Sequence, residues 1–312
     1  MRDGQGVISG AARPPSRARA WEDIVATAHV APDDTEAAAP TARLGRSSVG
    51  GVEAKPRGWA AEYAAWFDER SAVERYHLRP PYPAETFELL ASLAVGSPRV
   101  VLDAGCGPGD LARGLAPLVE RVDAVDRSGA MIAKGQAFLD EKIRWIHAAI
   151  EDAALEPPYA LIVAGDSIHW FDWQTAFRRF FDVLAPTGWL AVVYRDWLRD
   201  PQLREQLGPI YARHGANPDY AALDPVEELE RRGLFETVAS HTTSPVPWTP
   251  TPEELIGCHH SQNGFLLEKM RSPARFDEEV LAAVHELVPT RGGRFQLDVV
   301  ATIIWGHPHP AV

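Results

Sequence analysis

Short apolar runs alternate with segments of helical period through the middle of the chain, and this alternation restricts the fold more than any other feature. The apolar runs occupy residues 99–104, 121–126, 143–148, 159–165 and 189–195. Helical patterns occupy residues 110–119, 128–139 and 172–185; we expect Asp172 to cap the last of these helices and "PTG" at 186–188 to end it. Such runs are typical of strands that a parallel sheet buries on both faces. Repeated strand–helix steps with right-handed crossovers predict an α/β fold with a doubly wound, Rossmann-like sheet.

The segments around this core predict the domain organisation. Residues 1–57 are rich in Ala, Arg, Pro, Ser and Gly, which predicts a disordered arm before one folded domain over residues 58–312. After the core, two more strands are expected, at about 235–248 and 293–306. Roughly forty residues separate them, more than a plain connection needs, and insertions of this size commonly cover an active site. We expect a ligand-binding core at about 97–198, cover segments at about 58–96, 199–233 and 250–290, and late strands at about 235–248 and 293–306.

Composition and charge limit the partners. A chain of 312 residues with 46% hydrophobic content can bury a full core, and its formal charge of −12 argues against a nucleic-acid partner. No stretch approaches the ~18 apolar residues that span a bilayer, and residues 1–20 lack the apolar centre of a secretory signal. An Arg-rich start also occurs in organelle transit peptides, but Asp3 and Glu22 argue against that alternative. We expect no membrane association and a cytoplasmic location.

Cysteines are few. Cys106 and Cys258 show no recurrent metal-ligand spacing, so the sequence predicts no metal site and fits a reducing compartment.

Three glycines follow the first strand of the core, at the place where doubly wound sheets bind ligands. Gly105, Gly107 and Gly109 allow positive φ and close approach of the backbone to a ligand. A dinucleotide fingerprint can also be threaded through Gly107, Gly109 and Ala112, so a nicotinamide-dependent oxidoreductase is an alternative.

Two carboxylates beside this loop favour another ligand. We expect Asp110 to cap the following helix and repel a phosphate, where a dinucleotide would place its pyrophosphate. Asp103, just before the first glycine, adds a second negative charge. S-adenosylmethionine, which has a cationic amino-acid portion and a sulfonium but no phosphate, suits this field better. Asp126 ends the second strand, where a carboxylate can accept both ribose hydroxyls, and Ser128 is placed to cap the next helix.

The combined motifs carry a family resemblance. The segments "VLDAGCGPGDLARGL", "VDAVDRSGAMI", "YALIVAGDSIHWFD" and "FFDVLAPTGWLAVV" resemble class I S-adenosylmethionine-dependent methyltransferases with a methyltransferase type 11 domain. The resemblance is greatest to the small-molecule branch that includes trans-aconitate methyltransferases, and it extends over roughly residues 60–307. It implies a seven-stranded sheet, mostly parallel with an antiparallel last strand, and S-adenosylhomocysteine as the product.

The resemblance also implies cofactor contacts. Tyr76 and Arg79 are expected near the methionine carboxylate, and Asp103 is expected to orient the methionine ammonium through the loop. Ala149 stands where many relatives carry an acidic residue for the adenine amine, which leaves Glu151 or Asp152 as the acceptor. The full predicted cofactor set is Tyr76, Arg79, Asp103, Gly105, Cys106, Gly107, Asp126, Arg127, Met131, Ile150, Glu151, Gly165 and Asp166.

The expected reaction is direct in-line displacement of the methyl group by a small-molecule acceptor, for which aromatic or carboxylate-bearing compounds are candidates. His169 is the candidate general base, and the alternative is that it packs against the next helix. We expect His259 and His260 to form a solvated surface pair, with contact to substrate as the alternative. A non-catalytic cofactor-binding sensor or partner subunit with the same fold remains a further alternative.

Overall fold

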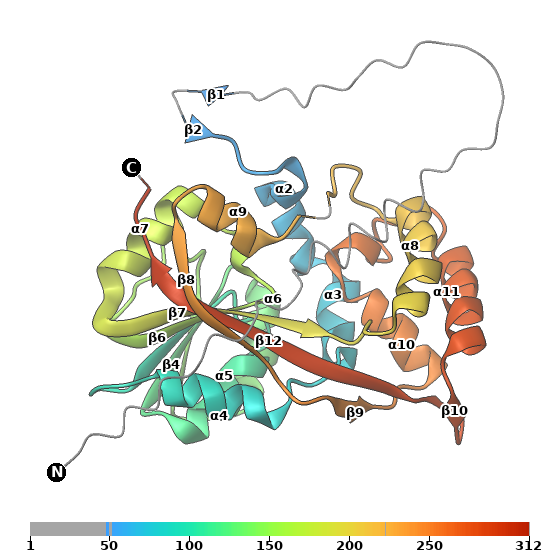
Figure 1. Cartoon of the computed structure of the whole chain (residues 1–312), viewed down its shortest axis with the longest axis horizontal. Coiled ribbons are helices and arrows are strands. Elements are labelled where there is room, and N and C mark those ends of the chain that lie inside the picture. The colour runs from blue at the N-terminus through green and yellow to red at the C-terminus, as the bar shows by residue number, and fades with distance from the viewer. Residues whose placement is uncertain (1–47, 50–51, 222, 312) are drawn as a thin grey trace.

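The computed structural model describes residues 48–49, 52–221 and 223–311 (Figure 1). Most of the predicted disordered arm, residues 1–57, lies outside the described residues. Two short strands, β1 (Ser48–Val49) and β2 (Val52–Glu53), pair antiparallel just before the first helical turns.

One mixed sheet organises the fold. Its strands lie in the order β5-β4-β3-β6-β7-β12-β8, with β9 paired to β12 as an eighth strand. Neighbours from β5 to β7 are parallel, whereas β12 is antiparallel to both β7 and β8. The predicted mostly parallel Rossmann-like sheet with an antiparallel last strand is therefore confirmed. The bounds are β3 (Val100–Ala104), β4 (Arg121–Asp126), β5 (Ile143–His147), β6 (Tyr159–Gly165), β7 (Leu184–Asp196), β8 (Phe235–Thr242), β9 (Val246–Trp248) and β12 (Leu297–Pro308).

Helices cover both faces of this sheet, as Figure 1 shows. On β3, Val101 belongs to the buried cluster that includes α4 (Ala84–Leu93) and α5 (Asp110–Leu115), whereas Leu102 belongs to the cluster that includes α7 (Trp173–Val183) and α9 (Pro225–Arg231), because neighbouring side chains of a strand point to opposite faces. The two apolar layers explain why the core strands read as continuous apolar runs. The helices are α4 (Ala84–Leu93), α5 (Asp110–Leu115), η5 (Ala116–Leu118), α6 (Gly129–Gln136), η6 (Ile168–Trp170), α7 (Trp173–Val183) and α9 (Pro225–Arg231).

Two predicted local features of these helices are confirmed. The Ser128 side chain caps α6 by accepting a hydrogen bond from the Met131 amide, and the Asp172 side chain caps α7 by accepting from Thr175. The third helix ends at Val183 and β7 begins at Leu184, so the expected stop at 186–188 lies inside the strand.

A second group of helices packs at one end of the sheet, beside the first half of β12 (Figure 1). Its apolar core includes Trp197, Leu207, Leu255, Phe276 and Phe295, all buried. The group consists of α8 (Pro201–His214), α10 (Pro252–His259), η7 (Asn263–Phe265), α11 (Pro273–Leu287), β10 (Thr290–Arg291) and β11 (Arg294–Phe295). The entry segment lies between this group and the sheet core as η2 (Arg57–Trp59), α2 (Ala61–Ala64), η3 (Ala65–Asp68), α3 (Arg70–Arg75) and η4 (Tyr76–Leu78).

The prediction that His259 and His260 form a solvated surface pair is wrong. His259 is fully buried; its Nε2 lies 2.7 Å from the Tyr211 hydroxyl, and burial lowers its pKa to about 4. His260 is also buried, and its Nε2 lies 2.8 Å from Asp277 Oδ1. These partners come from α8 and α11, so the pair is enclosed by helices distant in sequence.

Among the described residues, none of the helices combines the length and apolar character needed to cross a membrane.

Leu102 tests the central layer of the fold. Replacing Leu102 with Ala should lower the free energy of unfolding by about 2–5 kcal/mol, because the side chain is fully buried on β3 and its loss leaves a cavity. Leu139→Ala is the matched control, since Leu139 is 98% exposed, and it should change stability by less than about 0.5 kcal/mol. Urea denaturation measures both; equal losses would contradict this packing.

Candidate functional site

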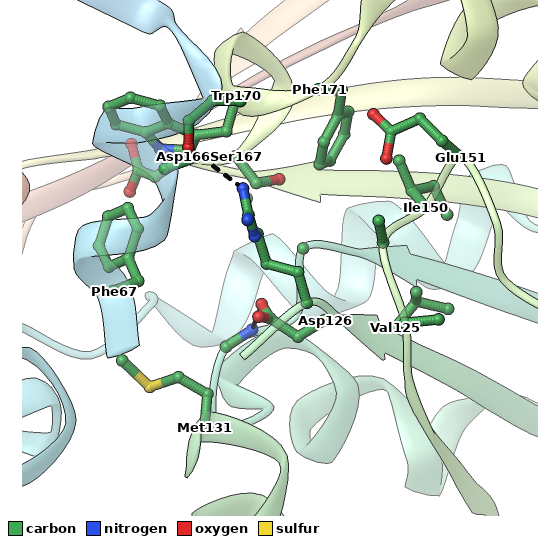
Figure 2. A pocket seen from close by; sticks show the side chains of 18 of the residues that line it. Phe67, Val125, Asp126, Met131, Ile150, Glu151, Asp166, Ser167, Trp170 and Phe171 are labelled. Carbon is green, nitrogen blue, oxygen red and sulfur yellow. Dashed lines mark hydrogen bonds between the residues drawn. The ribbon is translucent and has the colours of Figure 1, made fainter. Parts of the chain in front are cut away.

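A pocket of about 330 Å³ opens at the carboxyl ends of β3, β4 and β6. The sheet order reverses between β3 and β6, so the pocket lies at the switch point where doubly wound sheets bind ligands. The entry segment closes the opposite side with Ala61, Ala64, Phe67, Tyr76 and Arg79. Figure 2 shows Asp126 and Met131 at one side of the pocket, with Phe67, Trp170, Phe171 and Ile150 around the rest.

The glycine loop after β3 forms the floor of this pocket. Gly105 has φ +70°, and a Cβ there would lie 2.6 Å from the Cβ of Ser167. Gly107 has φ +55°, and its Cβ would lie 3.1 Å from the Tyr76 hydroxyl. Both positions therefore favour glycine by their positive φ, and at Gly105 a Cβ would also lack space. The amides of Gly105 and Cys106 both donate to the Val125 carbonyl at 2.9 Å, which attaches the loop to β4.

Asp126 lines the pocket from the end of β4. Its Oδ2 accepts from the Gly107 amide and its Oδ1 from the Ser128 amide, each at 2.8 Å. Burial raises the pKa of Asp126, while these two backbone hydrogen bonds oppose that shift. Each carboxylate oxygen can accept more than one hydrogen bond, so the fixed carboxylate retains acceptor capacity for ligand hydroxyls.

Asp103 lies beneath the loop and does not line the pocket. It is 1% exposed, and its Oδ2 finds no hydrogen-bond partner among the described residues. Burial raises the pKa of Asp103 to about 8, and a backbone hydrogen bond from Ala112 only partly opposes this. This shift favours the protonated form of Asp103 near neutral pH, whereas the sequence led us to expect a negative charge beside the loop.

Asp110 also differs from expectation. The cap position of α5 is Gly109, and no side chain caps the helix. The Asp110 carboxylate instead accepts from Arg113 at 2.8 Å and from Arg195 at 3.2 Å. These cations compensate its charge, so repulsion of a phosphate by Asp110 does not distinguish the possible ligands as the sequence suggested.

Arg195 is a structural part of the site that the sequence did not indicate. It is buried on β7, and its Nε lies 3.7 Å from Asp166 Oδ2, so that one guanidinium bridges the segments after β3 and β6. The same group lies 4.3 Å from the Tyr82 ring centroid. Asp166 has φ 51°, an unusual value for a residue other than glycine. In the sequence, the only indication of this role for Arg195 was its position as a charged residue at the end of an apolar strand.

Arg79 enters the pocket from the entry segment. Its guanidinium carbon lies 4.1 Å from the Tyr76 ring centroid. Its Nε donates to Ser261 Oγ at 2.9 Å and its Nη2 to the Ser261 carbonyl at 2.5 Å. Ser261 belongs to the predicted cover segment at about 250–290, so this late cover insertion holds the guanidinium of Arg79 in place.

The opposite end of the pocket is mostly apolar. Ile150 is buried there, beside Val125, Ala148 and Ala149. Glu151 also lines this end, but its Oε1 already accepts from the Asp172 amide at 2.6 Å. An apolar slot with a carboxylate at its edge fits an aromatic base.

His169 does not line the pocket. Its ring centroid lies 4.5 Å from that of Trp170 and 5.8 Å from that of Trp59, and its carbonyl accepts from Lys55 Nζ at 3.1 Å. This placement favours the packing alternative over the role of a base. Cys106 is likewise absent from the pocket wall, and it is buried with its pKa raised by burial.

The structure brings most of the predicted set together. The predicted residues that line the pocket are Tyr76, Arg79, Gly105, Gly107, Asp126, Arg127, Met131, Ile150, Glu151, Gly165 and Asp166. Those that do not are Asp103, Cys106 and His169. The wall also contains residues for which we predicted no site role, among them Ala61, Ala64, Phe67, Val125, Ser167 and Phe171. Small and aromatic residues of this kind are equally typical of a core, so their composition carried no distinct signal.

Among the described residues, no group of three or more His, Cys, Asp or Glu side chains is arranged to hold a metal ion.

Asp103 should make stability depend on pH. The folded protein binds this proton with a pKa of about 8, whereas an unfolded aspartate has a pKa of about 4. Between these values the folded state binds more protons, so the Asp103 contribution to stability falls as pH rises towards 8. Asp103→Asn removes this titration. From pH 5 to pH 8.5, the wild type should lose unfolding free energy relative to the variant.

Chemical denaturation at several pH values measures this difference, with Asp298→Asn, an exposed site, as control. If the wild type and Asp103→Asn give parallel curves, the buried, protonated Asp103 is contradicted.

Comparisons with known proteins agree with this geometry. Residues 101–188 match a family model described as a methyltransferase domain. A trans-aconitate 2-methyltransferase of Methylobacterium radiotolerans is 35% identical over 38% of this chain and 46% of its own length. A probable S-adenosylmethionine-dependent methyltransferase of Saccharomyces cerevisiae is 26% identical over 46% of this chain and 52% of its own length. The chain thus spans about half the length of these relatives.

A solved structure shows the same fold. A putative type II methyltransferase from Anaeromyxobacter dehalogenans aligns with a TM-score of 0.58 and 23% identity, covering 74% of this chain and 99% of that protein. The expected resemblance is therefore confirmed: residues 101–188 match a methyltransferase domain, and the relatives include proteins named as S-adenosylmethionine-dependent and trans-aconitate methyltransferases.

Proposed function

We propose that this protein transfers a methyl group from S-adenosylmethionine to a small-molecule acceptor. The observation that carries the proposal is the Asp126 carboxylate, which two backbone amides fix at the rim of the glycine loop inside the pocket. Oriented in this way, a carboxylate can accept hydrogen bonds from both hydroxyls of a ribose. The methyltransferase match over residues 101–188 supports the same cofactor.

The residues of the pocket fit the two ends of this cofactor. Ile150 and the apolar wall around it would hold the adenine, and Arg79 would bind the methionine carboxylate. Gly105 and Gly107 line the pocket with positive φ, a conformation that lets the loop backbone lie beside the ligand. Asp103 is a buried acid with an unpartnered Oδ2 beneath the loop, and a bound ammonium nearby would favour its ionised form.

The bound cofactor would supply an electrophilic methyl group on a sulfonium. The chain's own part is to orient the two reactants in line and to exclude water. Phe67, Trp170 and Phe171 place aromatic surface on the pocket wall for this purpose. Since His169 packs outside the wall, we propose that it does not act as a base. A carboxylate acceptor would need none.

The acceptor is proposed to be a small molecule with an aromatic or carboxylate group. Aromatic side chains on the wall suit a flat acceptor, and the relatives include proteins named trans-aconitate 2-methyltransferase.

Both described cysteines are buried free thiols, which supports a reducing, cytoplasmic location.

Asp126→Asn tests the cofactor site. The variant keeps the side-chain size but loses the charge that strengthens the hydrogen bonds to ribose. We expect the Kd for S-adenosylhomocysteine, measured by calorimetry, to rise about 10- to 100-fold. Asp182→Asn, on the outer face of α7, should leave the Kd unchanged. If Asp126→Asn binds S-adenosylhomocysteine as tightly as the wild type does, the proposed site is refuted. If the wild type binds NAD tightly but binds neither S-adenosylmethionine nor S-adenosylhomocysteine, the oxidoreductase alternative is favoured.

Label transfer tests the activity. Purified protein incubated with methyl-labelled S-adenosylmethionine and a metabolite extract should yield a labelled small molecule, identified by mass spectrometry. Asp126→Asn serves as the control with reduced transfer. Cofactor binding without labelled product across broad extracts would contradict the transferase and favour the binding-protein alternative.

A further inference from the structure

The late cover insertion, residues 249–296 between β9 and β12, contacts the pocket residue Arg79 through Ser261. Ser261 follows α10 and is fully buried. Its hydroxyl accepts from Arg79 Nε at 2.9 Å and donates to the Cys258 carbonyl at 2.6 Å, and its carbonyl accepts from Arg79 Nη2. A hydroxyl has one donor and two acceptor positions, so Ser261 can make both bonds at once.

Arg79 differs from Arg195, the buried guanidinium nearby. Arg195 faces the carboxylates of Asp110 and Asp166, which compensate its charge. The hydrogen-bond acceptors of Arg79 are the hydroxyl and carbonyl of Ser261, both neutral, and no described carboxylate forms an ion pair with it. The cation therefore lines the pocket, fixed in direction but uncompensated, which suits an anionic ligand group.

Ser261 is itself held firmly by the insertion. Its amide donates to the Cys258 carbonyl at 3.2 Å. The preceding His260 lies 2.6 Å from the Phe265 carbonyl through Nδ1 and 2.8 Å from Asp277 through Nε2. On the other side of Arg79, the Tyr76 ring restricts the guanidinium plane. Arg79 is thus held between the entry segment and the insertion.

We propose that Ser261 is a positioning residue, which directs Arg79 towards the cofactor carboxylate, so that the late insertion helps to set cofactor affinity. This inference rests on the proposed function. An arginine side chain that is already fixed loses less conformational entropy when it binds a carboxylate. Without the Ser261 hydroxyl, Arg79 Nε would lose its partner and the guanidinium would be less restricted.

Two ligands distinguish an effect of Ser261 on the position of Arg79 from a general disturbance of the pocket. S-adenosylhomocysteine carries the amino-acid carboxylate, whereas 5′-methylthioadenosine lacks the whole amino-acid portion. In calorimetric titrations, Ser261→Ala should raise the Kd for S-adenosylhomocysteine about fivefold to tenfold and leave the Kd for 5′-methylthioadenosine within about twofold.

Ser71→Ala is the matched control. Ser71 is also fully buried, and its hydroxyl donates to Glu268 of the same insertion at 2.5 Å, but it does not contact Arg79. Removing it should leave both Kd values within about twofold of wild type. Thermal unfolding of both variants reports whether each remains folded.

A double-mutant cycle with Arg79→Met completes the test. If Ser261 acts through Arg79, adding Ser261→Ala to Arg79→Met should not weaken S-adenosylhomocysteine binding further. The proposal is overturned if the two effects multiply, or if Ser261→Ala weakens both ligands equally or neither. Wild-type protein that binds neither ligand would instead overturn the proposed function itself.

Discussion

The attachment of the glycine loop to β4 is the interaction on which the site depends. The amides of Gly105 and Cys106 share the Val125 carbonyl, and the Gly107 amide donates to the Asp126 carboxylate. These bonds satisfy loop amides that would otherwise be buried without partners. They also fix the floor of the pocket and its main acceptor relative to each other, so a change in the loop moves both.

Buried charges hold the remaining walls in place. Arg195 joins Asp110, at the start of α5, to Asp166, after β6, while the Tyr82 ring covers it. Breaking such a group leaves an uncompensated buried charge, which costs more than an intact group contributes. The electrostatics of the pocket therefore differ from a simple sum of formal charges: Asp110 is paired with arginines, burial raises the pKa of Asp103, and Arg79 forms no ion pair with a described carboxylate.

Local patterns predicted the parts of this structure that depend on local physics. Apolar runs identified the core strands, and Ser128 and Asp172 were recognised as helix caps because each acts on an amide three residues away. Glycine spacing located the loop. The pairing of Asp110 with Arg195, the burial of His259 and the contact of Ser261 with Arg79 were missed, because each joins segments distant in sequence. The predicted electrostatic roles of Asp103 and Asp110 failed for the same reason. Neighbours in space, which the sequence does not show, decide whether a carboxylate is paired with a cation or favours its protonated form.

A crystal structure of the protein with S-adenosylhomocysteine would show whether Asp126 and Arg79 bind the cofactor. We expect the ligand to fill the pocket between the glycine loop and the entry segment, with its ribose hydroxyls on Asp126 and its carboxylate on Arg79. A ligand bound elsewhere, or bound in this pocket with its ribose away from Asp126, would contradict the proposed cofactor site.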